Sequence, residues 1–175
     1  MRFFISYRRT ESYAYAWQMA EELKRRHGDG CVFLDIGDVQ LGQDFRTRIE
    51  DEIRACDCVV VLIGPFWSDL THADEDFVHL ELSMAREHDR LIVPVLHTGA
   101  SMPSRESLPP ELEWLPYAQA GELRRPDEVA LIVDEVVERT RRHRATTEHA
   151  DVRPESVVGS DIGVAARTSA ARAVR

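Results

Sequence analysis

Short apolar runs alternate with longer amphipathic stretches along most of the chain. The apolar runs predict β-strands at residues 2–7, 31–34, 59–63, 91–96 and 115–120. Between them, apolar side chains recur every three or four positions, which predicts helices at residues 11–27, 44–55, 74–88 and 127–141. Strands that alternate with helices are typical of a parallel sheet covered by helices on both faces.

Two of the predicted strands also indicate their own place in the sheet. The run from Val59 to Ile63 is apolar at every position, as expected for a central strand buried on both faces. Pro94 interrupts the fourth run and provides no backbone N–H. It therefore predicts that this strand lies near an edge or a bulge.

The periodic pattern ends near residue 145, and Ser, Thr, Ala and Arg dominate from there on. We therefore expect one folded domain at residues 1–144 and a disordered tail or linker at residues 145–175. The chain has a formal net charge of −9, and all of its acidic excess lies ahead of the tail. An acidic body argues against nucleic acid as a partner, because phosphate binding needs clustered Arg or Lys.

The odd number of cysteines, Cys31, Cys56 and Cys58, indicates free thiols. Cys56 and Cys58 are too close for an unstrained disulfide in a strand and too few for a zinc site. Buried free thiols in a reducing compartment are the better interpretation, which predicts a cytoplasmic protein. No signal peptide is evident, and the longest apolar run is far too short to cross a bilayer. We therefore expect no membrane partner.

The most informative candidate for chemistry is Glu81, which follows the aromatic residue Phe77 by four positions. On a helix this spacing places the ring and the carboxylate on one face, one turn apart. A carboxylate beside a flat apolar surface is partly desolvated, which suits cleavage of a glycosidic type. The alternative is an ordinary helix start, in which Phe77 and Leu80 pack in the core and Glu81 is solvated.

Five segments in the right order resemble the TIR (Toll/interleukin-1 receptor) domain family, and bacterial members most of all. The likeness covers residues 1 to about 140. Phe77 stands where the W-x-x-x-E signature of the family has tryptophan, and Glu81 matches its glutamate. The matching segments are residues 3–9 (first box), 32–45 (second strand and BB loop), 59–67 (third strand and exit), 76–81 (signature) and 92–96 (fourth strand).

The resemblance implies a flavodoxin-like fold, with a five-stranded, mostly parallel sheet and helices on both faces. It also implies one of two functions. Some members cleave NAD⁺ between nicotinamide and ribose, which would make Glu81 the catalytic residue and NAD⁺ a substrate, with no further cofactor. Others are non-catalytic scaffolds. In both groups the domain acts through TIR–TIR self-association, and a role in bacterial defence is plausible by resemblance.

The chemistry implied for NAD⁺ is consistent with a single carboxylate. Nicotinamide leaves as a neutral molecule, so no general acid is needed, and one carboxylate can stabilise an oxocarbenium-like transition state. Ligands of open α/β sheets bind beyond the carboxyl ends of the strands. Candidate substrate contacts at that edge, each of which could instead be a turn, surface or core residue, are Phe4, Ser6, Arg8, Asp35, Leu41, Trp67 and Phe77.

Three other kinds of site are disfavoured. His72, Asp74, Asp76 and His79 lie close in sequence, but helical spacing does not bring enough ligands together, so no metal is expected. The segment Gly37–Gly42 lacks the Lys-Ser/Thr ending of an ATP-binding P-loop. A receiver domain would need an aspartate at the end of the third strand, whereas here the strand ends in Ile63-Gly64-Pro65.

Whether the product of NAD⁺ cleavage would be ADP-ribose or a cyclised form depends on water access to the site and stays open.

Overall fold

The structure is a computed structural model that describes residues 1–34, 45–70 and 77–151. Strands and helices alternate along it, as the apolar pattern predicts, except that 3₁₀ turns alone separate the last two strands. The strands and α-helices in chain order are β1 (Phe3–Ser6), α1 (Arg9–His27), β2 (Val32–Leu34), α2 (Phe45–Ala55), β3 (Cys58–Ile63), α3 (Phe77–Glu87), β4 (Leu91–His97), β5 (Gly121–Leu123) and α4 (Val129–Asp151).

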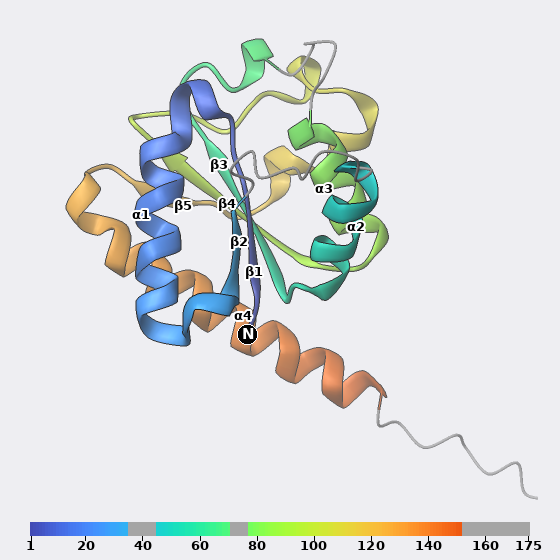
Figure 1. Cartoon of the computed structure of the whole chain (residues 1–175). Coiled ribbons are helices and arrows are strands. Elements are labelled where there is room, and N and C mark those ends of the chain that lie inside the picture. The colour runs from blue at the N-terminus through green and yellow to red at the C-terminus, as the bar shows by residue number, and fades with distance from the viewer. Residues whose placement is uncertain (35–44, 71–76, 152–175) are drawn as a thin grey trace, which may run out of the picture.

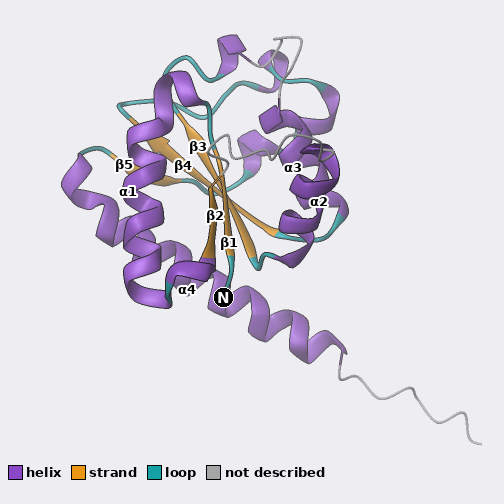
Figure 2. Cartoon of the chain, in the orientation of Figure 1, coloured by secondary structure: helices purple, strands orange, loops and turns teal. Residues whose placement is uncertain are grey.

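The strands form one sheet in the order β2-β1-β3-β4-β5, and every pairing is parallel. Figure 2 shows the strands running side by side, with helices on both faces of the sheet. The expected flavodoxin-like α/β architecture is therefore confirmed. In this order the chain reverses its direction of travel across the sheet between β1 and β3, and ligands of such folds bind at this reversal, beyond the carboxyl ends of the strands.

The sheet separates two apolar cores. α1 and α4 cover one face, and α2 and α3 cover the other (Figure 1). Neighbouring residues of β1 point to opposite cores, since Phe3 packs with α1 and α4 while Phe4 packs on the α2 and α3 side. All six residues of β3 are buried, which confirms the prediction of a central strand. Each large apolar side chain buried in this way contributes about 1.5–3 kcal/mol to folding.

Arg26 joins the two helices that cover the first face through an ion pair and a hydrogen bond. Arg26 of α1 binds Glu22 at 2.6 Å, contacts Asp134 of α4, and donates to the carbonyl of Ala130 at 3.1 Å. Hydrogen bonding by Arg25 lowers the pKa of the Glu22 carboxyl to about 2. Glu22 is therefore ionised throughout the neutral range, which keeps its pair with Arg26 within α1 charged.

Two predicted boundaries are wrong. The last strand lies at Gly121–Leu123 and not at residues 115–120, because Leu115–Tyr117 forms a 3₁₀ turn around Pro116. Helix α4 continues to Asp151, ten residues beyond its predicted end. Its last turns present no apolar face and are held by pairs such as Arg144–Glu148, four residues apart on the helix surface. The rest of the predicted tail, residues 152–175, lies outside the described residues.

Strand β4 has two different environments along its length. β3 pairs with Leu91 to Leu96, whereas β5 pairs only with the last three residues of the strand, from Val95 to His97. Within the described sheet, the first half of β4 is therefore a local edge, and Pro94 is the last residue of that half. This agrees with the position that the proline predicts.

The start of the chain meets α4 at the amino-terminal edge of the sheet. The amino group of Met1 lies 4.0 Å from the carboxylate of Asp57, and Nε of Arg144 in α4 lies 3.7 Å from the same carboxylate. Figure 1 shows this edge opposite to the carboxyl ends of the strands.

The cysteines and the helices bear on two further expectations. Cys31, Cys56 and Cys58 are buried free thiols, as predicted, and burial raises the pKa of Cys56 and Cys58 to about 12. Among the described helices, none combines the length and apolar character needed to cross a bilayer.

Candidate functional site

The structure brings Ser6 and Glu81 into direct contact at the carboxyl edge of the sheet. Ser6 is the last residue of β1, and Glu81 lies in the second turn of α3, 75 positions later. The Ser6 hydroxyl donates a 2.6 Å hydrogen bond to Oε2 of Glu81. Ser6 is 0% exposed and Glu81 is 3% exposed, so the alternative of a solvated Glu81 is wrong. A short hydroxyl–carboxylate bond in such surroundings fixes the direction of the carboxylate.

Phe77, unlike Glu81, is exposed to solvent. It is the first residue of α3, and its ring is 42% exposed, while Val78, Leu82 and Ala85 of the same helix are buried. The aromatic ring that stands in the tryptophan position of the signature is therefore a surface feature, one turn ahead of a buried carboxylate.

Arg8 and Trp67 form a second pair at the same edge. Trp67 follows β3 and is 1% exposed, and the guanidinium carbon of Arg8 lies 5.2 Å from the centroid of its ring. This is a cation–π geometry, which holds the arginine over the ring face. Nε1 of Trp67 is buried and has no hydrogen-bond acceptor among the described residues. Both predicted residues thus lie at the carboxyl edge, and Trp67 is buried beneath Arg8.

The other predicted contacts divide into two groups. Phe4 is fully buried and stacks on Phe33 with ring centroids 5.2 Å apart, so in this structure it is a core residue. Asp35 and Leu41 lie outside the described residues, and their proposed contacts with substrate stay predictions.

Sequence reasoning missed Glu11, which lies in the first turn of α1. Its Oε2 accepts the backbone N–H of Phe66 at 3.0 Å, and this bond ties α1 to the loop that carries Trp67. The backbone of Gly64 passes so close that a Cβ built there would lie 2.6 Å from Cδ of Glu11 and 2.9 Å from Cε1 of His97. A glycine directly after an apolar strand was the one available signal of such a close approach.

His97, at the end of β4, is a second residue that the sequence did not single out. It is 1% exposed, and its Nε2 lies 2.8 Å from the Ser12 hydroxyl while its Nδ1 lies 3.0 Å from the Thr98 hydroxyl. The Tyr15 ring packs on it with centroids 4.5 Å apart. Burial lowers the pKa of the imidazole, which favours the neutral form. The contact between His97 and Ser12 therefore joins the end of β4 to the start of α1.

Of the residues considered for a metal, His79 is the one that lies in the described part of the chain. Nε2 of His79 lies 3.6 Å from the carboxylate of Glu111, and His72, Asp74 and Asp76 fall outside the described residues. Within residues 1–34, 45–70 and 77–151, no three His, Cys, Asp or Glu side chains are placed to hold a metal ion.

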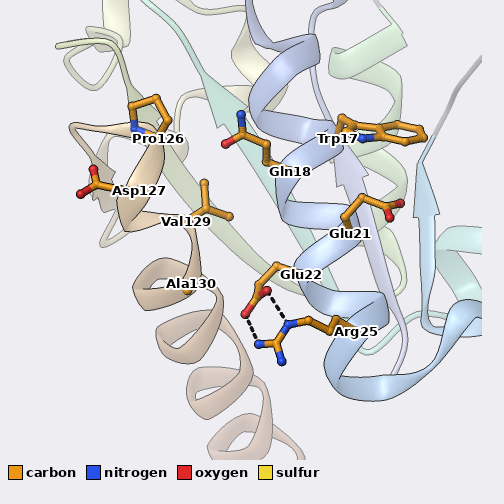
Figure 3. A pocket seen from close by; sticks show the side chains of 9 residues that line it. All are labelled: Trp17, Gln18, Glu21, Glu22, Arg25, Pro126, Asp127, Val129 and Ala130. Carbon is orange, nitrogen blue, oxygen red and sulfur yellow. Dashed lines mark hydrogen bonds and ion pairs between the residues drawn. The ribbon is translucent and has the colours of Figure 1, made fainter.

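A groove of about 570 Å³ lies between α1 and the start of α4 (Figure 3). Trp17 stands at one side of it and Pro126 at the other, and the Glu22–Arg25 pair lies at its lower end in this view. None of the predicted site residues lines this groove. Its position on the α1 and α4 side separates it from Glu81, which belongs to a helix on the opposite face of the sheet.

Known proteins resemble the chain in both fold and sequence. The crystal structure of the TIR domain of the Toll-related receptor TRR-2 from Hydra magnipapillata matches with a TM-score of 0.56 and 16% identity, over 79% of this chain and 97% of that one. The TIR domains of the activated Roq1 resistosome match with a TM-score of 0.49 and 15% identity, over 93% of this chain and 91% of that one.

One curated relative resembles the chain in sequence. The NAD(+) hydrolase tir-1 of Caenorhabditis elegans is 31% identical over 106 residues, which cover 59% of this chain and 10% of the worm protein. The chain thus spans about a tenth of that relative's length. The family model described as TIR domain matches residues 3–133, from the first residue of β1 into α4. With the whole sheet inside that match, the chain belongs to the TIR domain family.

Proposed function

We propose that this TIR domain cleaves NAD⁺ at the bond between nicotinamide and ribose. The observation that carries the proposal is the buried Ser6–Glu81 hydrogen bond at the carboxyl edge of the sheet. A carboxylate held in a fixed direction, in surroundings from which water is excluded, is suited to stabilise positive charge that develops on a sugar. The likeness to the worm NAD(+) hydrolase supports the proposal.

In the proposed reaction the C1′–N bond of the ribose breaks, and its electron pair leaves with nicotinamide, which departs as a neutral molecule. Water then adds to C1′ and loses one proton, so that NAD⁺ and water give ADP-ribose, nicotinamide and H⁺. Where a nucleophile from the same molecule reaches C1′ before water does, the product is cyclic. Glu81 stabilises the oxocarbenium-like transition state and binds a ribose hydroxyl.

The neighbouring residues have separate roles in this proposal. Ser6 orients the Glu81 carboxylate through the 2.6 Å hydrogen bond. Arg8, stacked on Trp67, binds the diphosphate of NAD⁺, since guanidinium groups suit phosphate oxygens. Phe77 provides an exposed ring at the start of α3 against which a flat group of the substrate can pack.

The burial of Glu81 requires a movement before any substrate can reach it, because only 3% of the residue is exposed. We propose that self-association through TIR–TIR contacts drives this movement and completes the site. A cytoplasmic location and a part in bacterial defence signalling belong to the same proposal and rest on the family resemblance.

The second candidate function is a TIR scaffold without catalysis, which acts through self-association alone. The same burial favours it, since a structural Ser–Glu pair would be shielded from solvent in the same way.

Release of nicotinamide from NAD⁺ separates the two functions. The full chain is incubated with NAD⁺ at dilute and at crowded concentration, and nicotinamide and ADP-ribose are quantified by chromatography. Nicotinamide release that disappears in Glu81→Gln supports the enzyme. A chain that self-associates and releases no nicotinamide at any concentration supports the scaffold.

A further inference from the structure

Glu11 closes a ring of contacts that includes Arg8. The carbonyl of Arg8 accepts the backbone N–H of Glu11 at 3.2 Å, and the Glu11 carboxylate accepts the backbone N–H of Phe66 at 3.0 Å. Trp67 is the next residue along the chain, and the Arg8 guanidinium lies over its ring at 5.2 Å. The ring of contacts thus runs from Arg8 through Glu11, Phe66 and Trp67 back to Arg8.

Each contact in this ring joins a different pair of segments. The first joins Arg8, in the segment after β1, to the opening turn of α1, the second joins α1 to the loop after β3, and the third joins that loop back to the segment after β1. Gly64 leaves space for the Glu11 side chain, because a Cβ at that position would collide with it. The position of Arg8 therefore depends on the loop after β3, and Glu11 is the side chain that fixes this loop to α1.

We propose that Glu11 is a positioning residue that holds Arg8 for binding a diphosphate. The inference rests on the proposed function for the choice of ligand, a nucleoside diphosphate ester such as the one in NAD⁺. Glu11 contacts no substrate in this scheme. It anchors the N–H of Phe66, the anchored loop holds Trp67, and Trp67 holds the Arg8 guanidinium at the carboxyl edge of the sheet.

A carboxylate near a diphosphate site could also act through its charge alone, and the two roles predict opposite results. Repulsion between Glu11 and the diphosphate would make every variant that lacks the charge bind more tightly. A tether requires only an acceptor of the right length. Glu11→Gln retains that acceptor, whereas Glu11→Ala removes it and Glu11→Asp keeps the charge but shortens the reach.

The experiment measures binding of ADP-ribose to the full chain by titration calorimetry, with adenosine as the probe that lacks the diphosphate. The variants are Glu11→Ala, Glu11→Asp, Glu11→Gln, Arg8→Ala and the double variant of Glu11→Ala with Arg8→Ala. Glu21→Ala is the matched control, because Glu21 is an exposed carboxylate of α1 that pairs with Lys24 at 3.0 Å. A thermal melt of each variant verifies that the domain is folded.

We expect Glu11→Ala and Glu11→Asp to raise the Kd for ADP-ribose roughly tenfold, the scale of one charge-assisted contact. Glu11→Gln and Glu21→Ala should bind within about twofold of wild type. The double variant should bind no more weakly than Arg8→Ala alone, since both changes remove the same contact. Adenosine binding should not change.

The inference is overturned if Glu11→Ala binds ADP-ribose as tightly as wild type, if its effect adds to that of Arg8→Ala, or if wild type binds no ADP-ribose. The proposed function fails separately, when wild type binds ADP-ribose with this pattern and releases no nicotinamide from NAD⁺. If wild type releases nicotinamide and Glu11→Ala binds ADP-ribose as tightly as wild type, the proposed function stands and the positioning role of Glu11 is wrong.

Discussion

Replacing Glu81 by glutamine separates the charge of the side chain from its packing. Glutamine has nearly the same volume, and its amide oxygen can accept the Ser6 hydroxyl in place of the carboxylate, across the same 2.6 Å. The substitution removes a buried negative charge and leaves the contact between β1 and α3 in place. We therefore expect folding to be preserved and NAD⁺ cleavage to be lost.

The two expected effects differ clearly in size. An exchange that keeps the hydrogen bond should change the free energy of unfolding by no more than about 1 kcal/mol. Loss of one preorganised group that stabilises transition-state charge lowers the rate at least 10²-fold, which corresponds to about 2.7 kcal/mol in the barrier. Glu81→Ala also leaves a cavity and removes the acceptor for Ser6, so it should cost about 2–4 kcal/mol of stability.

The assay compares nicotinamide release and thermal melts for wild type, Glu81→Gln and Glu81→Ala. Glu87→Gln serves as the matched control, since Glu87 is an exposed carboxylate at the end of the same helix. Glu81→Gln should melt close to wild type without turning over NAD⁺, and Glu87→Gln should keep full turnover. A folded Glu81→Gln protein that retains more than a tenth of wild-type turnover would refute the catalytic assignment.

Three further predictions concern assembly, the tail and pH. Specific activity should rise more than linearly with protein concentration, and a flat profile over a dilution series from a monomeric protein would contradict activation by self-association. A chain that ends at Arg144 should melt within a few degrees of the full-length chain and keep its NAD⁺ turnover, because residues 145–148 are exposed. A large drop in Tm would show that the removed residues pack on the domain. Burial lowers the pKa of His97, so stability should fall as the pH drops below about 6.5, where the unfolded chain takes up the proton more readily. Melts between pH 8 and pH 5 should therefore show a shallower slope in His97→Leu, and equal slopes would contradict this role.

The fold could be predicted from local spacing because each strand and helix has one face that must be buried. β5 was misplaced because it has three residues and pairs with only three residues of β4, which is too little for a periodic signal. Pro116 lay within the predicted strand, and its fixed φ suits the 3₁₀ turn that the structure has there. The last turns of α4 escaped prediction because surface pairs and not apolar contacts hold them.

Two different signals located the candidate site in the sequence. Ser6 was expected at the carboxyl edge because parallel strands end at one edge. Glu81 lies on a helix, and it was found by its spacing from Phe77 and by the family resemblance. The bond of Glu11 to Phe66 was not predictable, since it depends on how closely α1 approaches the β3 exit. His97 was missed because a histidine at the end of an apolar strand resembles an ordinary surface residue until the partner helix is placed.

Met1 and Arg144 of α4 both lie near the carboxylate of Asp57. This position determines where a fusion partner can be attached to the domain. A reporter or surface anchor joined ahead of Met1 emerges at the amino-terminal edge of the sheet (Figure 1), whereas Ser6 ends β1 at the opposite, carboxyl edge. Copies immobilised in this way present their carboxyl edges away from the support. Fluorescent fusions at that end and arrays on a chip therefore offer a route to measure nicotinamide release without masking the site.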